Sequence, residues 1–225
     1  VEEVNAGQTW TGVRITADAD LATATLGEGN DSLTVNSTGA DVSTSVDAWD
    51  GSDQVTFNAS AGADVDVTVN GGWGEDSVSI TASAQDGEGN YQGEANITAS
   101  ITGGQGEDTI NLSVVNVANG YNSAEGQIHA TVDGGTGYDV VNVQGGYNDN
   151  LTLSGVEEVN AGQTWTGVTI TADADLATAT LGEGNDSLTV SSTGADVSTS
   201  VDAWDGRDQV TFNASAGADV DVTVN

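Results

Sequence analysis

Apolar and polar residues alternate along many short stretches of this chain, in the pattern of half-buried β-strands. Residues 64–69 (DVDVTV) and 76–80 (DSVSI) show the alternation clearly. Clusters of Gly, Asn, Asp and Ser separate these stretches, as they do at turns between strands. No helix is predicted anywhere, and we expect an all-β fold.

One set of strands shares the pattern Gly-x-Asp-x-apolar-x-apolar. Its members begin at residues 29, 51, 74, 106 and 137, and again at 184 and 206. A related segment begins at Gly155 and places Glu157 where the others have Asp. Successive members lie 18 to 32 residues apart, a period typical of solenoids.

A second set of alternating segments lies between the first, at 12–17, 41–46, 64–69, 96–101, 127–132 and 150–155. Two short strands per turn predict a parallel β-solenoid, similar to a β-roll or β-helix, with about six coils per long repeat. Residues 21–26 (LATATL) are expected to add a third short strand to their coil. Residues 84–94 and 117–126 are expected to bulge as loops on one side.

The apolar residues of both sets are mostly β-branched, which suits strands stacked over a thin core. The predicted inward residues are Leu33, Val35, Val55, Phe57, Val65, Val67, Val69, Val78, Ile80, Ile97, Ala99, Ile101, Ile110, Leu112, Ile128, Ala130, Val132, Val141, Val143, Leu151 and Leu153.

A long repeat overlies the short one, because residues 1–70 recur as 156–225. The copies differ only where Arg14, Asn36 and Ser52 become Thr169, Ser191 and Arg207. Residues 1–155 therefore form one full repeat, and 156–225 begin the next one, continuous with the first. Since the chain starts mid-pattern without Met, we expect it to be a segment of a longer polypeptide.

The charge of the chain narrows the range of partners. It has 35 acidic residues, two Arg and no Lys, for a net charge of −33. Nucleic acid and anionic membranes are disfavoured, because there are almost no cations to meet phosphates. No stretch approaches the roughly 20 apolar residues of a membrane span, and without Cys there is no disulfide framework. Such a charge suits metal cations or a salty exterior.

The motif aspartates stack into a column if the coils are in register. Neighbouring carboxylates about 5 Å apart repel by roughly 1 kcal/mol in water, and more where they are shielded from it. A column of this kind needs compensating charge, which the chain hardly supplies. Ca²⁺ would supply it, since it binds carboxylate and carbonyl oxygens, and glycine lets the turn aim carbonyls at an ion.

Three segments have the full sequence GGxGxDxUx, where U is a large apolar residue: 71–79, 103–111 and 134–142. Residues 26–34 and 181–189 lack only the first Gly, and 48–56 keep only the second half. The chain thereby resembles the haemolysin-type calcium-binding repeats of the RTX family. The resemblance implies Ca²⁺ between successive coils, held by Asp31, Asp53, Asp76, Asp108, Asp139, Asp186 and Asp208. It also implies backbone ligands from Gly27, Gly29, Gly51, Gly72, Gly74, Gly104, Gly106, Gly135, Gly137, Gly182, Gly184 and Gly206.

The chain departs from that family in one respect. Its motifs lie a whole coil apart, and the opposite turns do not match. We therefore expect at most one column of ions, interrupted at Glu157. Turns of Gly, Asn and Asp without any metal remain the alternative.

The repeated, acidic sequence without a catalytic constellation favours a structural role. We expect a calcium-stabilised rod or fibre segment of a large cell-surface or matrix protein: an adhesin, surface layer or filament. Its partners would be calcium ions and neighbouring repeats or like subunits stacked end to end. An enzyme is not expected, although acidic pairs such as Glu2–Glu3 leave two-carboxylate hydrolysis formally open. His129 is expected to point outward.

Two binding functions are alternatives. Exposed aromatics at the turns would bind surface polysaccharide or a partner: Trp10, Trp49, Trp73, Tyr121, Tyr138 and Tyr147. Ice binding would require the same small residue at one outward position in coil after coil. The outward loop position instead reads Glu28, Asp50, Trp73, Gln105 and Thr136.

Overall fold

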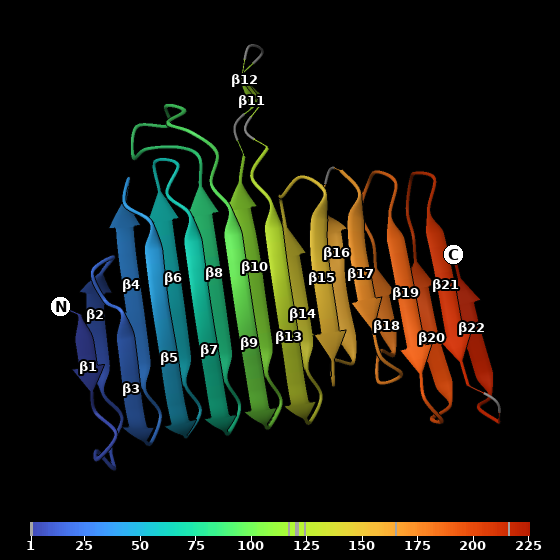
Figure 1. Ribbon diagram of the computed structural model, residues 1–225, viewed down its shortest axis with the longest axis horizontal. Coiled ribbons are helices and arrows are strands. Elements are labelled where there is room, and N and C mark those ends of the chain that lie inside the picture. The colour runs from blue at the N-terminus through green and yellow to red at the C-terminus, as the bar shows by residue number, and fades with distance from the viewer. Residues whose placement is uncertain (1, 117, 120–121, 124, 165, 216) are drawn as a thin grey trace.

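Two parallel sheets of ten strands each run the length of the molecule (Figure 1). The structure is a computed structural model and describes residues 2–116, 118–119, 122–123, 125–164, 166–215 and 217–225. Sheet A contains β1 (Glu3–Asn5), β3 (Thr23–Glu28), β5 (Val42–Asp50), β7 (Val65–Trp73), β9 (Ile97–Gln105), β13 (Ile128–Thr136), β15 (Asp149–Ser154), β17 (Val168–Ala172), β19 (Ser187–Ser192) and β21 (Gln209–Ala214).

Sheet B contains the strands that alternate with these along the chain. They are β2 (Arg14–Asp18), β4 (Ser32–Thr38), β6 (Gln54–Ser60), β8 (Ser77–Ser83), β10 (Thr109–Val115), β14 (Val140–Gln144), β16 (Glu158–Gln163), β18 (Thr178–Thr180), β20 (Val197–Asp202) and β22 (Val220–Val224). Each coil thus contributes one strand to each sheet, which confirms the predicted all-β parallel solenoid.

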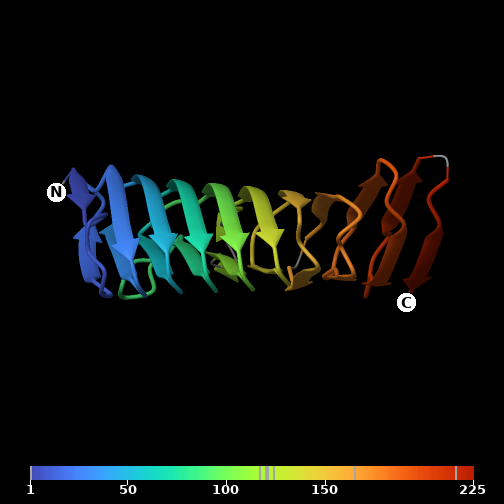
Figure 2. The same ribbon diagram turned by 90° about the horizontal axis from the view of Figure 1, so that it is seen from below.

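The two sheets form two layers, and the termini lie at opposite ends of the long axis (Figure 2). The part of the chain that the structure describes contains no helix, and so none long and apolar enough to span a membrane. Both sheets continue without interruption from the first long repeat into the second, through the pairs β14–β16 and β15–β17.

A thin apolar core fills the space between the sheets. Like residues stack on like, as where Leu33 pairs with Val55, and Val55 with Val78. A single buried cluster extends from Leu21 to Ala203. Every residue predicted to point inward is buried, and His129 is exposed as expected. The alternation of apolar residues therefore predicted the core correctly.

Two long loops depart from the regular coils. Residues 84–96 connect β8 to β9, and residues 116–127 connect β10 to β13. Both extend from the same edge of the solenoid (Figure 1), as expected. The second contains a short antiparallel pair of β11 (Ala118–Asn119) and β12 (Asn122–Ser123). Tyr121, one of the aromatics considered for binding, lies outside the described residues.

The described residues of the first long repeat contribute an odd number of strands to the two sheets, which was not predicted. Residues 21–26 were expected to add a third strand to a coil, but Thr23–Glu28 form β3, a full member of sheet A. The described part of residues 1–155 therefore supplies thirteen strands to the two sheets, or six and a half coils. As a result, β3 lies in sheet A, whereas its copy β18 lies in sheet B.

Glycines at the turns let one coil lie directly on the next. A Cβ added at Gly104 would overlap the carbonyl oxygen of Gly72, one coil earlier. In the same way, a Cβ added at Gly74 would overlap the carbonyl oxygen of Gly51, and one added at Gly106 would overlap that of Gly74. These glycines also have positive φ, between 116° and 133°, which other residues rarely adopt.

We predict that Gly104→Ala destabilises the solenoid much more than Gly39→Ala. Both glycines have positive φ, 116° and 71°, but an added Cβ at Gly39 meets nothing within 4 Å. Gly39→Ala should cost only the backbone strain of about 1–2 kcal/mol. Gly104→Ala should cost a further 1–3 kcal/mol or so, because the coils must separate. Urea unfolding followed by circular dichroism measures both; equal losses would refute close stacking as the reason for Gly104.

Candidate metal-binding columns

Six acidic side chains form a column along the edge where the chain passes from sheet A to sheet B. This AB column consists of Asp31, Asp53, Asp76, Asp108, Asp139 and Glu157. Each lies in the turn before a strand of sheet B, so the parallel register of that sheet places the side chains one above another. The sequence predicted the five aspartates of this column and the position of Glu157.

Hydrogen bonds link the column from coil to coil. The backbone N–H of each acidic residue donates to a carboxylate oxygen of the next coil. The distance is 2.7 Å from Asp31 N to Asp53 Oδ1 and 2.8 Å for each of the next three pairs, up to Asp139. The last bond runs from Asp139 N to Glu157 Oε2, at 2.7 Å. Glu157 therefore continues this ladder of hydrogen bonds.

One oxygen of most of these carboxylates has no partner. The Oδ2 atoms of Asp53, Asp76, Asp108 and Asp139 are buried and accept no hydrogen bond. The same is true of the Oδ2 atom of Asp186, which lies outside this column. Asp31 differs, because its Oδ2 accepts a bond of 2.9 Å from Gly27 N. A buried acceptor without a partner is costly and calls for a proton or a cation.

Burial disfavours the charged form of these side chains. It raises the pKa of Asp53 to about 6 and that of Asp76 to about 7, and the neighbouring carboxylates raise both further. The pKa of Asp139 rises to about 6, and the pKa values of Asp108 and Asp186 also rise, all chiefly because of burial. The backbone N–H donors act in the opposite direction but do not prevail.

The unpartnered oxygens face backbone oxygens of the next coil. A Cβ added at Gly103 would meet both Asp108 Oδ2 and the carbonyl oxygen of Gly134. Gly71 is placed in the same way between Asp76 Oδ2 and the carbonyl of Gly103. Carboxylate and carbonyl oxygens thus converge on the space between coils, and such an all-oxygen donor set fits a hard cation such as Ca²⁺.

The ligand set is limited, however. Among the described residues, no group of three or more His, Cys, Asp or Glu side chains surrounds a common point. An ion in the AB column would therefore take its oxygens from one or two carboxylates, from backbone carbonyls and from water.

The motif glycines have a role that needs no metal. Many of those proposed as backbone ligands stack closely on the coil before them: Gly51, Gly72, Gly74, Gly104, Gly106, Gly135, Gly137 and Gly206. Gly27 and Gly182 leave room for the side chains of Thr9 and Thr164, and Gly29 and Gly184 lie against Thr11 and Thr166. Close stacking of the coils thus explains why glycine is needed at these positions. The hydrogen bond from a backbone N–H explains the placement of one oxygen of each carboxylate. Only the second, buried oxygen points to a ligand.

The structure places the motif aspartates on two edges of the solenoid, whereas the sequence predicted one. Asp186 and Asp208 lie on the opposite edge, in turns that lead from sheet B to sheet A. Asp186 N donates to Asp208 Oδ1 at 3.0 Å, and Asp186 Oδ1 accepts from Val168 N at 2.8 Å. The cause is the odd number of strands per repeat, which turns the second copy onto the other edge.

Asp149 belongs to this second edge, and the sequence analysis missed it. Its Oδ1 accepts a hydrogen bond of 2.9 Å from Ile128 N, and it is almost fully buried. Burial raises its pKa to about 7. The available signal was the turn Gly145-Gly146-Tyr147-Asn148, in which Gly145, Gly146 and Asn148 all have positive φ. We call Asp149, Asp186 and Asp208 the BA group.

Comparison with models of known protein families, with curated proteins and with solved structures finds no match to this chain. The geometry of the two edges is therefore the basis for the functional inference.

We predict that the metal-free protein loses stability as the pH rises, and that Asp149→Asn weakens this dependence. A pKa of about 7 in the folded chain, against about 3.9 when unfolded, means that the folded state holds the proton more tightly. The contribution is full below about pH 4 and is lost as the pH rises through 7, by at most about 4 kcal/mol.

Urea unfolding in chelator at pH 5 and pH 8 measures this difference. The amide that replaces the carboxyl group in Asp149→Asn keeps an acceptor for Ile128 N and carries no charge, so the variant should be the more stable protein at pH 8. Asp66→Asn, at an exposed position of sheet A, is the control and should keep the wild-type dependence. An Asp149→Asn variant as sensitive to pH as the wild type would contradict the assignment.

Proposed function

We propose that this chain is a segment of a calcium-stabilised extracellular rod or fibre, part of a large cell-surface or matrix protein. The observation that supports it best is the AB column, with its row of buried, unpartnered carboxylate oxygens. These oxygens need a cation at neutral pH, and the chain has only two Arg to set against 35 acidic residues.

Calcium suits this column better than other cations. It accepts six to eight oxygen ligands in flexible geometry, whereas Mg²⁺ demands a regular octahedron. Asp53, Asp76, Asp108 and Asp139 would hold it through Oδ2, together with backbone carbonyls such as those of Gly103 and Gly134. When bound, the ion supplies positive charge that offsets the repulsion between successive carboxylates. Extracellular modules use Ca²⁺ sites of about 10⁻⁴–10⁻³ M affinity, which fits the proposed location.

The two ends of the solenoid favour stacking as the mode of assembly. In the last coil, Val220 and Val224 are 49% and 51% exposed, and Val210 and Phe212 are only partly buried. Val4 and Ile15 are likewise partly buried in the first coil. A further coil, from a neighbouring repeat or a like subunit, would cover these residues and pair with the strand edges.

We predict that Ca²⁺ raises the unfolding temperature and that Asp108→Asn removes at least one Ca²⁺ site. The amide oxygen of this variant still accepts the hydrogen bond from Asp76 N, but the side chain presents no charge to the ion. Isothermal titration calorimetry counts the sites, and thermal unfolding with Ca²⁺, Mg²⁺ or chelator gives the stabilisation.

Asp66→Asn serves again as the control, because it removes one charge outside both edges. It should bind as many Ca²⁺ ions as the wild type. If millimolar Ca²⁺ leaves the unfolding temperature of the wild type unchanged, the columns are not calcium sites and the metal-free alternative holds.

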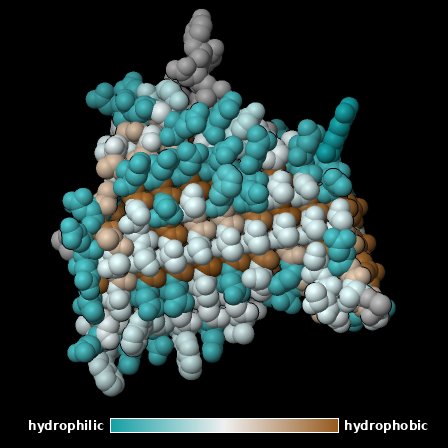
Figure 3. All heavy atoms as spheres, in the orientation of Figure 1, coloured by the Kyte–Doolittle hydropathy of each residue, from teal (hydrophilic) through white to brown (hydrophobic). Residues whose placement is uncertain are grey.

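A second candidate function rests on the outer face of sheet A. The loop position considered in the sequence carries no ladder of like residues, but the middle of the sheet does. One outward register position is Thr or Ser in nine successive strands: Thr23, Ser45, Thr68, Ser100, Thr131, Thr152, Thr171, Thr189 and Thr211. Rows of similar side chains run along one broad face in Figure 3.

This hydroxyl ladder favours binding to an ordered surface such as ice, since its groups repeat at the strand spacing of about 4.8 Å. Solubility of the exposed sheet accounts equally well for any one of these residues; the regularity over nine strands is what supports ice binding.

We predict that, if sheet A binds ice, Thr131→Tyr abolishes most of the activity, because the ring interrupts the ladder at its centre. Thermal hysteresis and inhibition of ice recrystallisation measure it. Thr56→Tyr places the same ring on the outer face of sheet B and should change nothing; tyrosine suits strands, so both variants should fold. A wild-type protein without either activity would refute this candidate.

A further inference from the structure

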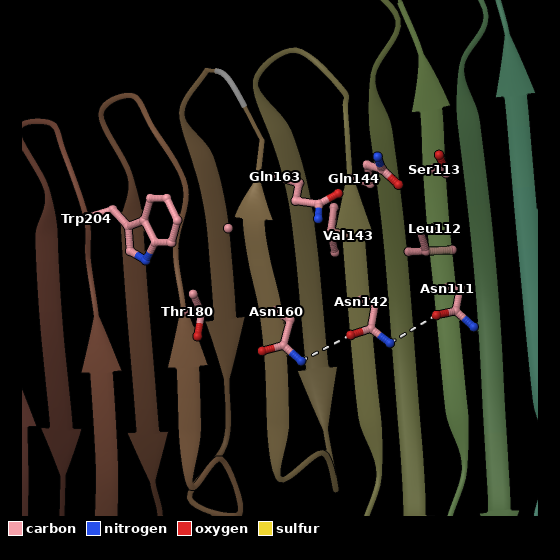
Figure 4. A pocket seen from close by; sticks show the side chains of 11 residues that line it. Asn111, Leu112, Ser113, Asn142, Val143, Gln144, Asn160, Gln163, Thr180 and Trp204 are labelled. Atoms are coloured by element: carbon pink, nitrogen blue, oxygen red, sulfur yellow. Dashed lines mark hydrogen bonds between the residues drawn. The ribbon is translucent and has the colours of Figure 1, made fainter.

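A shallow groove crosses the outer face of sheet B and reaches the edge where the chain passes from sheet B to sheet A. It has a volume of about 480 Å³, within the range of roughly 300–1,000 Å³ typical of ligand sites. Its sides come from β10, β14, β16 and β18, and Trp204 stands at one end (Figure 4). The indole of Trp204 is 58% exposed.

A bulge in β16 creates the hollow. Asn142 pairs with Asn160, but two residues further along β14, Gln144 pairs with Gln163. The extra residue in β16 interrupts the regular surface, and Gly162 in the bulge has no side chain to fill the gap. A Cβ added at Gly162 would lie 4.0 Å from Cζ2 of Trp204, so the ring borders the space that the glycine leaves open.

The side chains of the groove are uncharged, in a chain with a net charge of −33. They are mostly amides and hydroxyls, among them Asn142, Gln144, Gln163 and Thr180, around the indole of Trp204. Acidic residues occur only around it. Glu158 accepts from Asn160 Nδ2 at 2.8 Å, and Asp202 follows Thr180 in register; Glu183 lines an adjoining hollow.

Three asparagines form a row along the groove. Asn142 Nδ2 donates to Asn111 Oδ1 at 3.0 Å, and Asn160 Nδ2 donates to Asn142 Oδ1 at 3.1 Å. A side-chain amide offers two N–H groups and two acceptor positions. Asn111 and Asn142 therefore keep N–H groups beyond these bonds, whereas Asn160 uses both of its own, for Asn142 and Glu158. The row holds the amides in fixed orientations at the strand spacing of about 4.8 Å.

From this geometry we propose that the groove binds a neutral polysaccharide. Sugar rings would lie along the asparagine row, where the amides bond to their hydroxyls, and one ring would stack on the indole of Trp204. A pyranose ring is about as long as the strand spacing, so successive rings meet successive amides. The acidic surroundings exclude polysaccharides with carboxylate or sulfate groups. The site needs no metal and is independent of the calcium proposal.

Trp49 provides a natural comparison, since it is the copy of Trp204 in the first repeat. Both lie in the segment Ala-Trp-Asp-Gly, and both have positive φ, 75° and 55°. Trp49 lies near the end of β5 in sheet A, and its Nε1 donates to Asp47 Oδ2 at 3.0 Å. Beside Trp49, β3 and β1 are the copies of β18 and β16, whereas the described residues contain no strand in sheet A that corresponds to β14 or β10.

The experiment measures binding of soluble neutral hexasaccharides with gluco-, manno- and galacto- backbones, by isothermal titration calorimetry and by tryptophan fluorescence. An oligomer of alginate serves as the anionic probe. We expect one of the neutral hexasaccharides to bind in the micromolar to millimolar range. Trp204→Ala should weaken it by about tenfold or more, and Asn142→Ala by several-fold, since each removes one contact.

Two controls separate the groove from general effects. Trp49→Ala removes the other copy of the tryptophan, and Asn58→Ala removes an asparagine of sheet B that bonds to Asn36 outside the groove. Both should bind as the wild type does, and circular dichroism checks that all four variants are folded. The proposal fails if no neutral hexasaccharide binds in the millimolar range or if alginate binds as well. Equal losses from Trp49→Ala and Trp204→Ala would also overturn it, in favour of turn aromatics as a whole.

Discussion

The solenoid depends on the hydrogen bond between the backbone N–H of a turn residue and the carboxylate one coil further on. The turn lies outside the strand ladders, so its N–H would otherwise be left unpaired where coils stack. From Asp31 to Glu157 the same bond recurs at 2.7–2.8 Å. It joins successive coils just before the strands of sheet B, and the five aspartates that take part in it are buried. The glycine turns let successive coils approach closely enough for this hydrogen bond to form. Because the bond uses only one carboxylate oxygen, the other oxygen is left buried between the coils.

That consequence links architecture with charge. A protonated column needs no ion, whereas an ionised one does. The raised pKa values of Asp53, Asp76 and Asp139 show that burial makes the neutral form more favourable in the folded protein than it is in water. A cation between coils would reverse this preference, because it stabilises the ionised carboxylates. Stability and the supply of cations would then be coupled along the AB column.

The odd number of strands gives the long repeat an unusual property. The near-identical segments 1–70 and 156–225 place their matching strands in opposite sheets, as β3 in sheet A and its copy β18 in sheet B show. Trp49 and Trp204 show the effect, since one segment lies at the edge of sheet A and the other borders a groove in sheet B. A repeated sequence therefore presents two different surfaces, and a repeat that is uniform in sequence is not uniform in its contacts.

Much of the fold and part of the candidate site followed from local patterns. Alternation in segments such as 64–69 identified the inward residues, and the shared turn motif predicted the stacking of Asp76 between Asp53 and Asp108. Asp149 escaped prediction because its turn differs from the motif. Asp186 and Asp208 were assigned to the wrong edge because the alternation in LATATL was too short to count as a full strand. The groove escaped as well, because a bulge is a property of the pairing between β14 and β16.

The sequence by itself determined the fold class, the inward face of each strand and the residue types at the turns, because each depends on neighbours within a few positions. The tertiary structure decided which edge each carboxylate occupies, which oxygens are left without partners and where the outer surface is hollowed. Those features depend on how many strands separate two segments and on how distant strands pair, and no local pattern carries that information.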